Sequence, residues 1–219
     1  MPRTLKPAEA ELSNAFVRAK ALLPKLSALL FDLDGTLVDT MDLHFRAYQT
    51  VLSDLGGTLI RSDFSEIVGP PAEITVPRFV KAAGLDPASL PTMAEIHLRK
   101  KLAFAALIAE QPPPMLPAAH LLLRMCRTLA IAVVTSGNKS GADAILGAAG
   151  LIGALNALVT GDDVKHGKPY PDPYRLALSS LGCSANEALA FEDHDDGIQS
   201  ATRAGLAVID VRTSKLVTP

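Results

Sequence analysis

Five short apolar runs recur along the chain, and segments with helical periodicity separate the later ones. Runs of consecutive apolar residues are typical of parallel strands whose two faces are both covered by other elements. The runs are residues 28–32, 130–135, 157–160, 188–193 and 206–211, and helical patterns occupy residues 141–149, 173–181 and 197–204. This alternation predicts an α/β fold, in which a Rossmann-like, doubly wound parallel sheet is built with right-handed crossovers.

The segment between the first and second apolar runs has a different character, because it shows no strand pattern. Its apolar residues recur at helical spacing in residues 41–56, 72–84 and 91–110. We expect a bend at Pro77 and a helix start at Pro91, because proline disturbs a helix interior but suits the first helical position. The sequence therefore predicts an all-helical cap domain, residues 41–112, inserted into an α/β core domain of residues 27–40 and 113–219.

Residues 1–26 are expected to form an N-terminal helical extension. Leu12, Phe16, Ala19 and Leu23 share one face of the predicted helix, and Pro24 ends it. One apolar face favours a helix that packs on the core. A helix that binds a partner protein is the alternative.

Composition and charge exclude several classes of protein. Of the 219 residues, 48% are hydrophobic, which indicates a folded core. The net charge of −2 comes from both signs spread along the chain, whereas a nucleic-acid surface needs clustered basic residues. No apolar run approaches the roughly 18–20 residues that span a bilayer, and the N-terminus lacks a signal-peptide pattern. Cys126 and Cys183 are isolated, as expected of reduced thiols. We expect a cytoplasmic protein, a monomer or weak dimer, with no nucleic-acid or membrane partner.

Polar side chains follow the first four predicted strands at their carboxyl ends, where open α/β sheets bind their ligands. Asp32 and Asp34 follow the first strand, and Glu192 and Asp193 close the fourth. Lys168 lies in a proline-rich loop after the third strand. The second strand is followed by Thr135, Ser136, Gly137 and Asn138. Features that are distant in sequence therefore converge on one edge of one sheet.

The residue types at this edge suit phosphoryl transfer. Several carboxylates in one crevice are unfavourable without a cation, and hard oxygen ligands favour Mg²⁺. The metal ligands expected are Asp32, Asp34, Glu192 and Asp193. Lys168, the hydroxyl groups and the backbone N–H groups of residues 135–138 can bind phosphoryl oxygens. One aspartate, Asp32 or Asp34, can attack phosphorus while the other protonates the leaving oxygen.

The sequence resembles the haloacid dehalogenase-like superfamily, in the branch with a helical cap after the first motif. The four stretches that carry the resemblance are "FDLDGTLVDT", "VVTSGN", "GKPYPDPY" and "FEDHDDGIQSATRAG", in this order. The resemblance implies that Asp32 is the nucleophile and Asp34 the acid/base, and that Thr135 and Lys168 bind phosphate. It also implies that Mg²⁺ is bound at Glu192 and Asp193 together with Asp32 and the main chain of Asp34.

Details of the motifs discriminate within this family. Dehalogenases lack an acidic residue at the position of Asp34, so the resemblance implies phosphoryl transfer. The patterns are similar to those of phosphoglycolate-phosphatase-like and β-phosphoglucomutase-like enzymes, and His44 fits the start of their cap. In the loop after Gly69, Ala72 stands where the mutases carry a phosphate-binding arginine. His194 replaces the small residue that often follows the acidic pair of the fourth motif, and it could narrow the pocket or bond to a carboxylate. The chain also ends early relative to these enzymes, so we expect the N-terminal helix to cover part of the core.

The sequence therefore predicts a Mg²⁺-dependent phosphatase that hydrolyses a small phosphorylated metabolite through an aspartyl-phosphate. A sugar-phosphate mutase is the alternative within the same enzyme family. A regulatory protein that keeps the fold without catalysis is the alternative outside it. A dinucleotide-binding module is disfavoured, because no GxGxxG sequence follows the first strand.

Overall fold

A computed structural model describes residues 7–68 and 72–219 of the chain. The first six residues of the predicted extension and residues 69–71 lie outside the described residues. The chain divides after Asp39 and before Pro114 into two compact units. The described part of the second unit, Thr40–Pro113, is helical without a strand, and the first unit contains the sheet.

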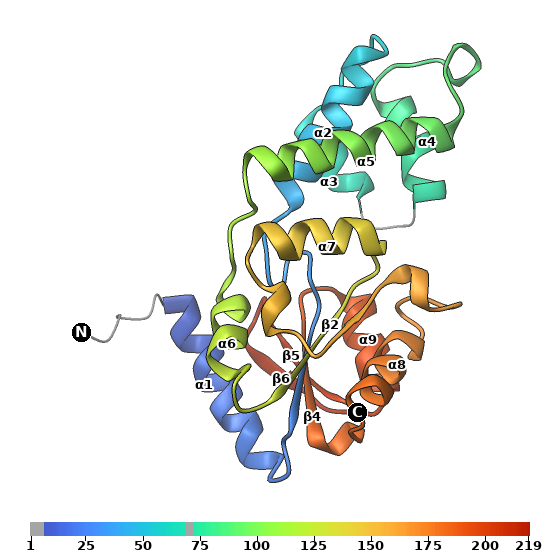
Figure 1. The fold of residues 1–219 in the computed structure, drawn as a ribbon. Helices are drawn as coiled ribbons and strands as arrows, with labels where there is room; N and C mark the ends of the chain where they lie inside the picture. The colour runs from blue at the N-terminus through green and yellow to red at the C-terminus, as the bar shows by residue number, and fades with distance from the viewer. Residues whose placement is uncertain (1–6, 69–71) are drawn as a thin grey trace. The chain divides into compact units, whose positions relative to one another are not determined.

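The first unit is built on a six-stranded sheet with the order β3-β2-β1-β4-β5-β6 (Figure 1). The strands are β1 (Ala28–Phe31), β2 (Ala130–Val134), β3 (Ala157–Val159), β4 (Ala188–Glu192), β5 (Ala207–Asp210) and β6 (Lys215–Val217). The first five are parallel, and each lies within one predicted run, which confirms the predicted doubly wound α/β fold. The sequence pattern does not predict β6, which pairs antiparallel with β5 at the edge of the sheet.

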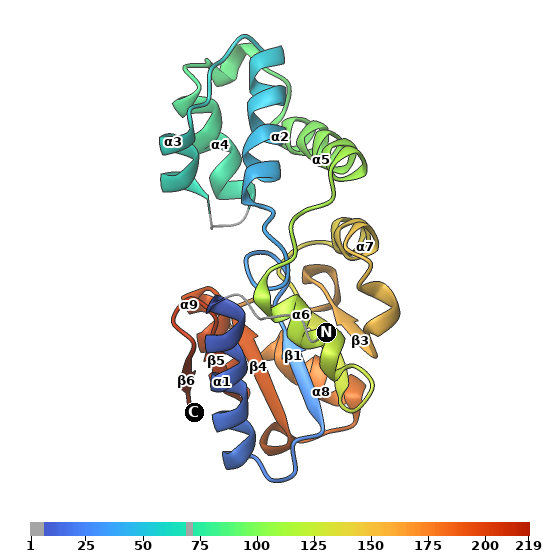
Figure 2. The same ribbon diagram turned by 90° about the vertical axis from the view of Figure 1, so that its left-hand side faces the viewer.

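Helices cover both faces of this sheet (Figures 1 and 2). One face carries α8 (Asp172–Leu181) and α9 (Asp195–Arg203), which contact the central strands. On that face Leu30, Val134 and Ala190 pack into one buried cluster with Tyr174 of α8. On the other face the rings of Phe31 and Phe191 stack with centroids 4.6 Å apart. α7 (Lys139–Ala148) connects β2 to β3.

Helix α1 (Pro7–Leu22) belongs to the first unit, where it packs against α6 (Pro117–Met125) and β6. Leu12, Phe16 and Ala19 are buried on the face predicted from the sequence. Leu23 lies just beyond the end of the helix. Apolar burial of this kind is the main source of stability for a short helix, so α1 is held mainly by tertiary contacts.

The second unit contains α2 (Met41–Asp54), α3 (Arg61–Ile67), α4 (Ala72–Ala82) and α5 (Met93–Glu110). Its core gathers aromatic rings from three helices, with Tyr48 and Phe64 both near Phe79. The prediction that a helix begins at Pro91 is wrong. α5 begins at Met93, because Thr92 caps it by accepting a hydrogen bond from the Glu95 N–H at 3.2 Å. The pattern also missed α3, and α4 continues through Pro77.

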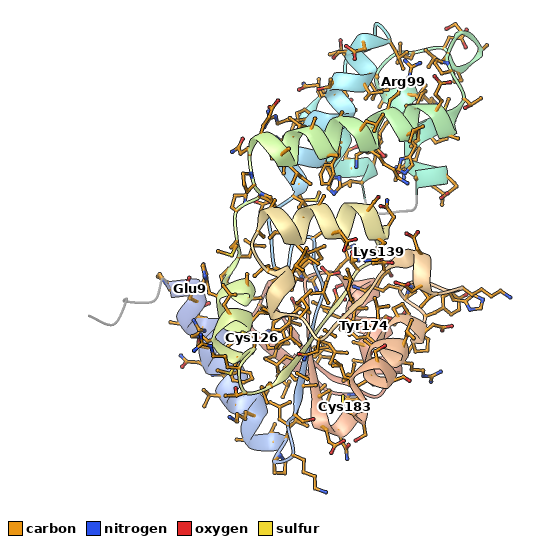
Figure 3. All side chains as sticks on the ribbon, in the orientation of Figure 1. Glu9, Arg99, Cys126, Lys139, Tyr174 and Cys183 are labelled. Carbon is orange, nitrogen blue, oxygen red and sulfur yellow. The ribbon has the colours of Figure 1, made fainter. Side chains whose placement is uncertain are left out.

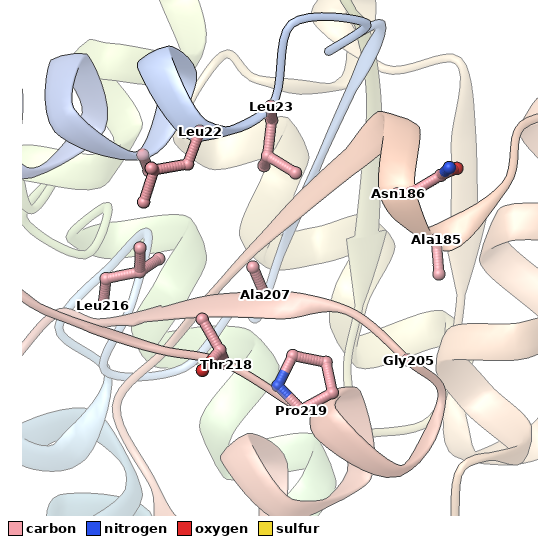
Figure 4. Close-up of a pocket in the computed structure, with 10 residues that line it drawn as sticks. Leu22, Leu23, Ala185, Asn186, Gly205, Ala207, Leu216, Thr218 and Pro219 are labelled. Carbon is pink, nitrogen blue, oxygen red and sulfur yellow. The ribbon is translucent and has the colours of Figure 1, made fainter.

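An apolar hollow of about 220 Å³ lies where the end of α1 approaches β6 (Figure 4). Leu22, Leu23, Leu216 and Pro219 contribute to its lining. None of the predicted site residues lines it, so the hollow is separate from the chemistry considered below. Among the described residues, no helix has the length and apolar character needed to cross a membrane.

Candidate active site

The candidate site lies at the carboxyl ends of β1 and β4, which are neighbours in the sheet. The chain runs from β1 to β2 in one direction and from β3 back to β4, so the topology switches between β1 and β4. Sheet pairing continues to Asp32, whose N–H donates to the carbonyl of Phe191 at 3.0 Å. Asp32 and Glu192 therefore stand side by side at the point where ligands of open α/β sheets bind.

Lys168 joins three parts of the chain at this point. Its ammonium Nζ lies 2.7 Å from Asp32 Oδ1, 2.6 Å from Glu192 Oε1 and 2.9 Å from the carbonyl oxygen of Val134. An ammonium has three N–H donors, and here each has one acceptor. The side chain of Lys168 is 6% exposed and that of Glu192 is 1% exposed, so these contacts are shielded from water. Lys168 thus fixes both carboxylates in place.

Asp193 is held by the loop that follows β1. Its Oδ1 accepts a hydrogen bond from the Thr36 hydroxyl at 3.3 Å. A Cβ atom added to Gly35 would lie 2.1 Å from Asp193 Oδ2, and Gly35 has a φ angle of +89°. Only glycine therefore fits position 35, both for its backbone and for the space that the carboxylate occupies. The first and fourth sequence motifs interlock through this contact.

The acidic side chains fit a divalent cation. Asp32, Glu192 and Asp193 each offer an oxygen, and these oxygens lie within 4.8 Å of one another. Asp32 Oδ2 is buried and has no hydrogen-bond partner among the described residues. A buried carboxylate oxygen without a partner is costly, and a cation in contact with it would remove that cost.

Ionisation in the cluster follows from burial and charge. Burial raises the pKa of Asp32 well above 3.8; the Lys168 ammonium opposes this shift, and Glu192 and Asp193 reinforce it. Burial also raises the pKa of Asp193, with a further contribution from Glu192. Burial alone would lower the pKa of Lys168, but Asp32 and Glu192 outweigh it and raise that pKa, so the ammonium stays protonated. The carboxylates are thus crowded enough to favour either a proton or a cation.

The predicted substrate-binding residues in the loop after β2 differ in their exposure and in their hydrogen bonds. Thr135 is buried, and its hydroxyl oxygen accepts from the Gly137 N–H at 3.0 Å. Ser136 and Gly137 are exposed. The side chain of Asn138 caps α7, because its Oδ1 accepts from the Gly141 N–H at 2.9 Å. Asn138, predicted as a substrate ligand, thus already has a structural use for its side-chain oxygen.

Two further predicted positions have distinct surroundings. Asp34 is half-buried in the loop after β1, and its side chain is not part of the acidic cluster of Asp32, Glu192 and Asp193. His194 is the N-cap of α9, and its Nδ1 accepts from the Asp196 N–H at 3.3 Å. The residue that departs from the family pattern therefore serves the helix start.

Sequence reasoning missed several residues around the site. Tyr174 donates its hydroxyl hydrogen to Glu192 Oε1 at 2.5 Å. Gly197 leaves room for the Glu192 carboxylate, since an added Cβ would lie 2.1 Å from its Cδ. Arg212 bonds Asp195 at the start of α9 and Asp210 at the end of β5. The available signals were the place of Gly197 in the fourth motif and of Tyr174 at the end of the third, but nothing in the sequence pairs Tyr174 with Glu192.

Within the second unit, His44 belongs to a polar cluster inside an aromatic environment. Its Nδ1 lies 2.7 Å from Lys100 Nζ, and its ring stacks on Phe104 with centroids 4.1 Å apart. Lys100 is buried, and its ammonium also lies over the ring of Tyr48. The sequence singled out His44 but not Lys100, whose position depends on how α5 packs against α2.

The fold and the acidic site together are typical of one class of enzyme, the haloacid dehalogenase-like hydrolases, and comparison with known protein families supports this assignment. The model of the haloacid dehalogenase-like hydrolases matches residues 29–211. This match covers most of the chain, so the protein belongs to the haloacid dehalogenase-like hydrolase family, as the sequence motifs predicted. Helix α1 precedes the matched region.

Individual relatives are similar over nearly the same region. The protein CbbY of Cereibacter sphaeroides is 34% identical over 192 residues, which are 84% of this chain and 83% of that protein. The fructose-1-phosphate phosphatase YqaB of Escherichia coli (strain K12) is 31% identical over 193 residues, 86% of this chain and 97% of that protein. Among solved structures, a variant of CbbY from Rhodobacter sphaeroides in complex with xylulose-(1,5)bisphosphate has a TM-score of 0.73 at 34% identity, over 84% of each chain.

Proposed function

We propose that this protein is a Mg²⁺-dependent phosphatase that hydrolyses a phosphoric monoester of a small metabolite through an aspartyl-phosphate on Asp32. The observation that carries the proposal is the state of the Asp32 carboxylate. One oxygen is held by Lys168 at 2.7 Å, and the other is buried without a partner among the described residues. A carboxylate fixed in this way is oriented for attack and costs little further ordering in the reaction.

The first chemical step forms a bond between an Asp32 oxygen and phosphorus and breaks the bond from phosphorus to the leaving oxygen. Asp34 supplies the proton that the leaving alkoxide needs. Lys168 keeps the nucleophile in place, and the Thr135 hydroxyl and the N–H group of Ser136 can donate to the phosphoryl oxygens. In the second step Asp34 takes a proton from water, which attacks the aspartyl-phosphate and releases inorganic phosphate and free Asp32.

Mg²⁺ has candidate ligands in Asp32, Glu192 and Asp193, and the family resemblance adds the main chain of Asp34. When bound, it neutralises charge on the carboxylates and on the transferring phosphoryl group. The chain's own residues provide the placement: Lys168 and Tyr174 hold Glu192, and Thr36 with Gly35 hold Asp193.

Sugar phosphates are the first substrates to test. The relatives include a fructose-1-phosphate phosphatase and a CbbY variant whose structure holds xylulose-(1,5)bisphosphate. Ala72 stands where the mutase pattern has a phosphate-binding arginine, which favours water over a second sugar as the phosphoryl acceptor. We therefore propose hydrolysis of a pentose or hexose phosphate.

The deciding experiment measures inorganic phosphate released from a panel of sugar phosphates and from p-nitrophenyl phosphate, with Mg²⁺ or with EDTA. We expect Mg²⁺-dependent release, and we expect Asp32→Asn to reduce it by at least about 10³-fold, because the nucleophile is lost. Isomerisation of a sugar phosphate without phosphate release would favour a mutase. No turnover of any ester with Mg²⁺ would favour a regulatory protein and refute the proposal.

A further inference from the structure

Tyr174 is a fully buried tyrosine whose hydroxyl faces the acidic cluster. It lies in the first turn of α8 and packs against the sheet in the same buried cluster as Leu30 and Ala190; Figure 3 labels it. Its O–H donates to Glu192 Oε1 at 2.5 Å. A buried phenol needs such a partner, and the phenylalanine that would fill the same volume could not make this bond.

The same oxygen of Glu192 also binds Lys168. Lys168 Nζ lies 2.6 Å from Glu192 Oε1 and 5.5 Å from the centre of the Tyr174 ring. Tyr174 therefore touches the pair in two ways, through its hydroxyl on the carboxylate and through its ring face toward the ammonium. Lys168 continues the chain of contacts to Asp32 at 2.7 Å.

Oε1 of Glu192 accepts from two donors, Tyr174 and Lys168, and these contacts also determine where Oε2 lies. The carboxylate lies against the first turn of α9, in space that a Cβ at position 197 would fill. One of its oxygens lies within 4.8 Å of oxygens of Asp32 and Asp193. The carboxylate thus has two tasks, to hold Lys168 and to face a cation, and its rotation decides how well each is performed.

We propose that Tyr174 is a positioning residue for Glu192. Its phenol holds Glu192 Oε1 in contact with Lys168, and the carboxylate is thereby oriented so that Oε2 can face the cation. This inference rests on the proposed Mg²⁺-dependent function. A phenol hydroxyl is protonated at physiological pH, so it donates to the Glu192 carboxylate. Without the hydroxyl, Glu192 Oε1 keeps only Lys168, and the carboxylate can rotate away from the cation.

Tyr174→Phe removes only the hydroxyl, and Tyr48→Phe is its matched control. Tyr48 is also buried, its hydroxyl bonds to Thr75, and it belongs to the second unit. Each variant loses one buried hydrogen bond, so both should lower the midpoint of thermal unfolding by a similar few degrees. A merely structural role for Tyr174 predicts nothing beyond this shared effect.

The distinguishing measurement is Mg²⁺ binding without substrate, by isothermal titration calorimetry on the full chain. We expect Tyr174→Phe to weaken Mg²⁺ binding about tenfold, as for other groups that orient a metal ligand, and Tyr48→Phe to leave it unchanged. With p-nitrophenyl phosphate, Tyr174→Phe should lower kcat more than it changes KM. In a Glu192→Gln background the effect of Tyr174→Phe on Mg²⁺ binding should disappear, since Tyr174 acts through Glu192.

Several outcomes would overturn the inference. Equal Mg²⁺ affinity in the two phenylalanine variants would do so, and so would an undiminished effect of Tyr174→Phe in the Glu192→Gln background. A wild-type protein that binds no Mg²⁺ would also refute it. A wild-type protein that binds Mg²⁺ but hydrolyses no phosphate ester would refute the proposed function instead, and the binding comparison would still decide the role of Tyr174.

Discussion

Replacing Gly197 by alanine would place a methyl group where the Glu192 carboxylate now lies. The added Cβ would be 2.1 Å from Glu192 Cδ and Oε2 and 2.3 Å from Oε1. The backbone itself accepts alanine, because Gly197 is a helical residue in the first turn of α9. The end of a glutamate side chain can usually move aside, but this one is held by Lys168 and Tyr174 and is 1% exposed.

Two effects of opposite sign determine the stability of Gly197→Ala. Alanine is favoured over glycine inside a helix by about 1 kcal/mol. Displacing Glu192 separates it from the buried ammonium of Lys168, and breaking a buried ion pair on one side costs about 3–5 kcal/mol. The net expectation is a loss of about 2–4 kcal/mol in the free energy of unfolding, which corresponds to a melting temperature lower by roughly 4–16 °C.

Gly147→Ala in α7 supplies the matched control, because its added Cβ would be 3.6 Å from Ile152 Cδ1, an ordinary contact. This variant should gain about 0.5–1 kcal/mol from helix preference alone. Urea unfolding of both variants, with phosphate release from p-nitrophenyl phosphate, gives the comparison. We expect Gly197→Ala to lose stability and about 100-fold in kcat/KM, because it displaces Glu192, which is a proposed metal ligand. If it instead matched Gly147→Ala in stability and the wild type in activity, the reasoning about the Glu192 contacts would be wrong.

Three further predictions concern α1, the strand end at β5 and the cation. Phe16→Ala should lower the free energy of unfolding by about 3 kcal/mol, because Phe16 is buried, while turnover at 20 °C persists; unchanged urea unfolding would show that α1 is not part of the core. Arg212→Met should cost at most about 1 kcal/mol at pH 7, since the pair with Asp210 is partly exposed. Hydrogen bonds from Arg212 lower the pKa of Asp210, so this cost is fully present above pH 3.8 and vanishes as pH falls through the lowered pKa; a cost that persisted in acid would contradict it. If Mg²⁺ binds the acidic cluster, the increase in melting temperature that it causes should grow as pH rises through the raised pKa values of Asp32 and Asp193, above 3.8, because protons leave these carboxylates there; a flat profile in thermal scans would argue against a cation at these residues.

The sequence predicted well those strands whose own run of apolar residues is enough to identify them. β1 and β4 are buried along their whole length, and such runs are visible without knowledge of the neighbours. β6 escaped prediction because Lys215–Val217 is short and partly exposed, and it becomes a strand only by pairing with β5. Pro91 led to a wrong prediction of the helix start, because proline can also stand just before an N-cap. Thr92 is the better capping residue, so α5 begins after it.

The candidate site shows the same division between local and tertiary information. Asp32, Lys168 and Glu192 could be grouped because each lies at or after the carboxyl end of a strand, at the same edge of the sheet. Asn138 caps α7, and the motif pattern alone does not distinguish this local structural role from the predicted binding of substrate. Tyr174 could not be assigned, because its contact with Glu192 exists only once α8 lies against the sheet.

The division of the chain after Asp39 and before Pro114 has a consequence for engineering. The acidic cluster and Lys168 all lie outside the segment Thr40–Pro113. That segment leaves the sheet-bearing unit once and returns once, and a backbone hydrogen bond from the Asp39 N–H to the Pro114 carbonyl, 2.9 Å long, joins the two crossing points. Residues 40–113 could therefore be replaced by the corresponding segment of a relative, and the sequence around each carboxylate of the cluster would stay unchanged.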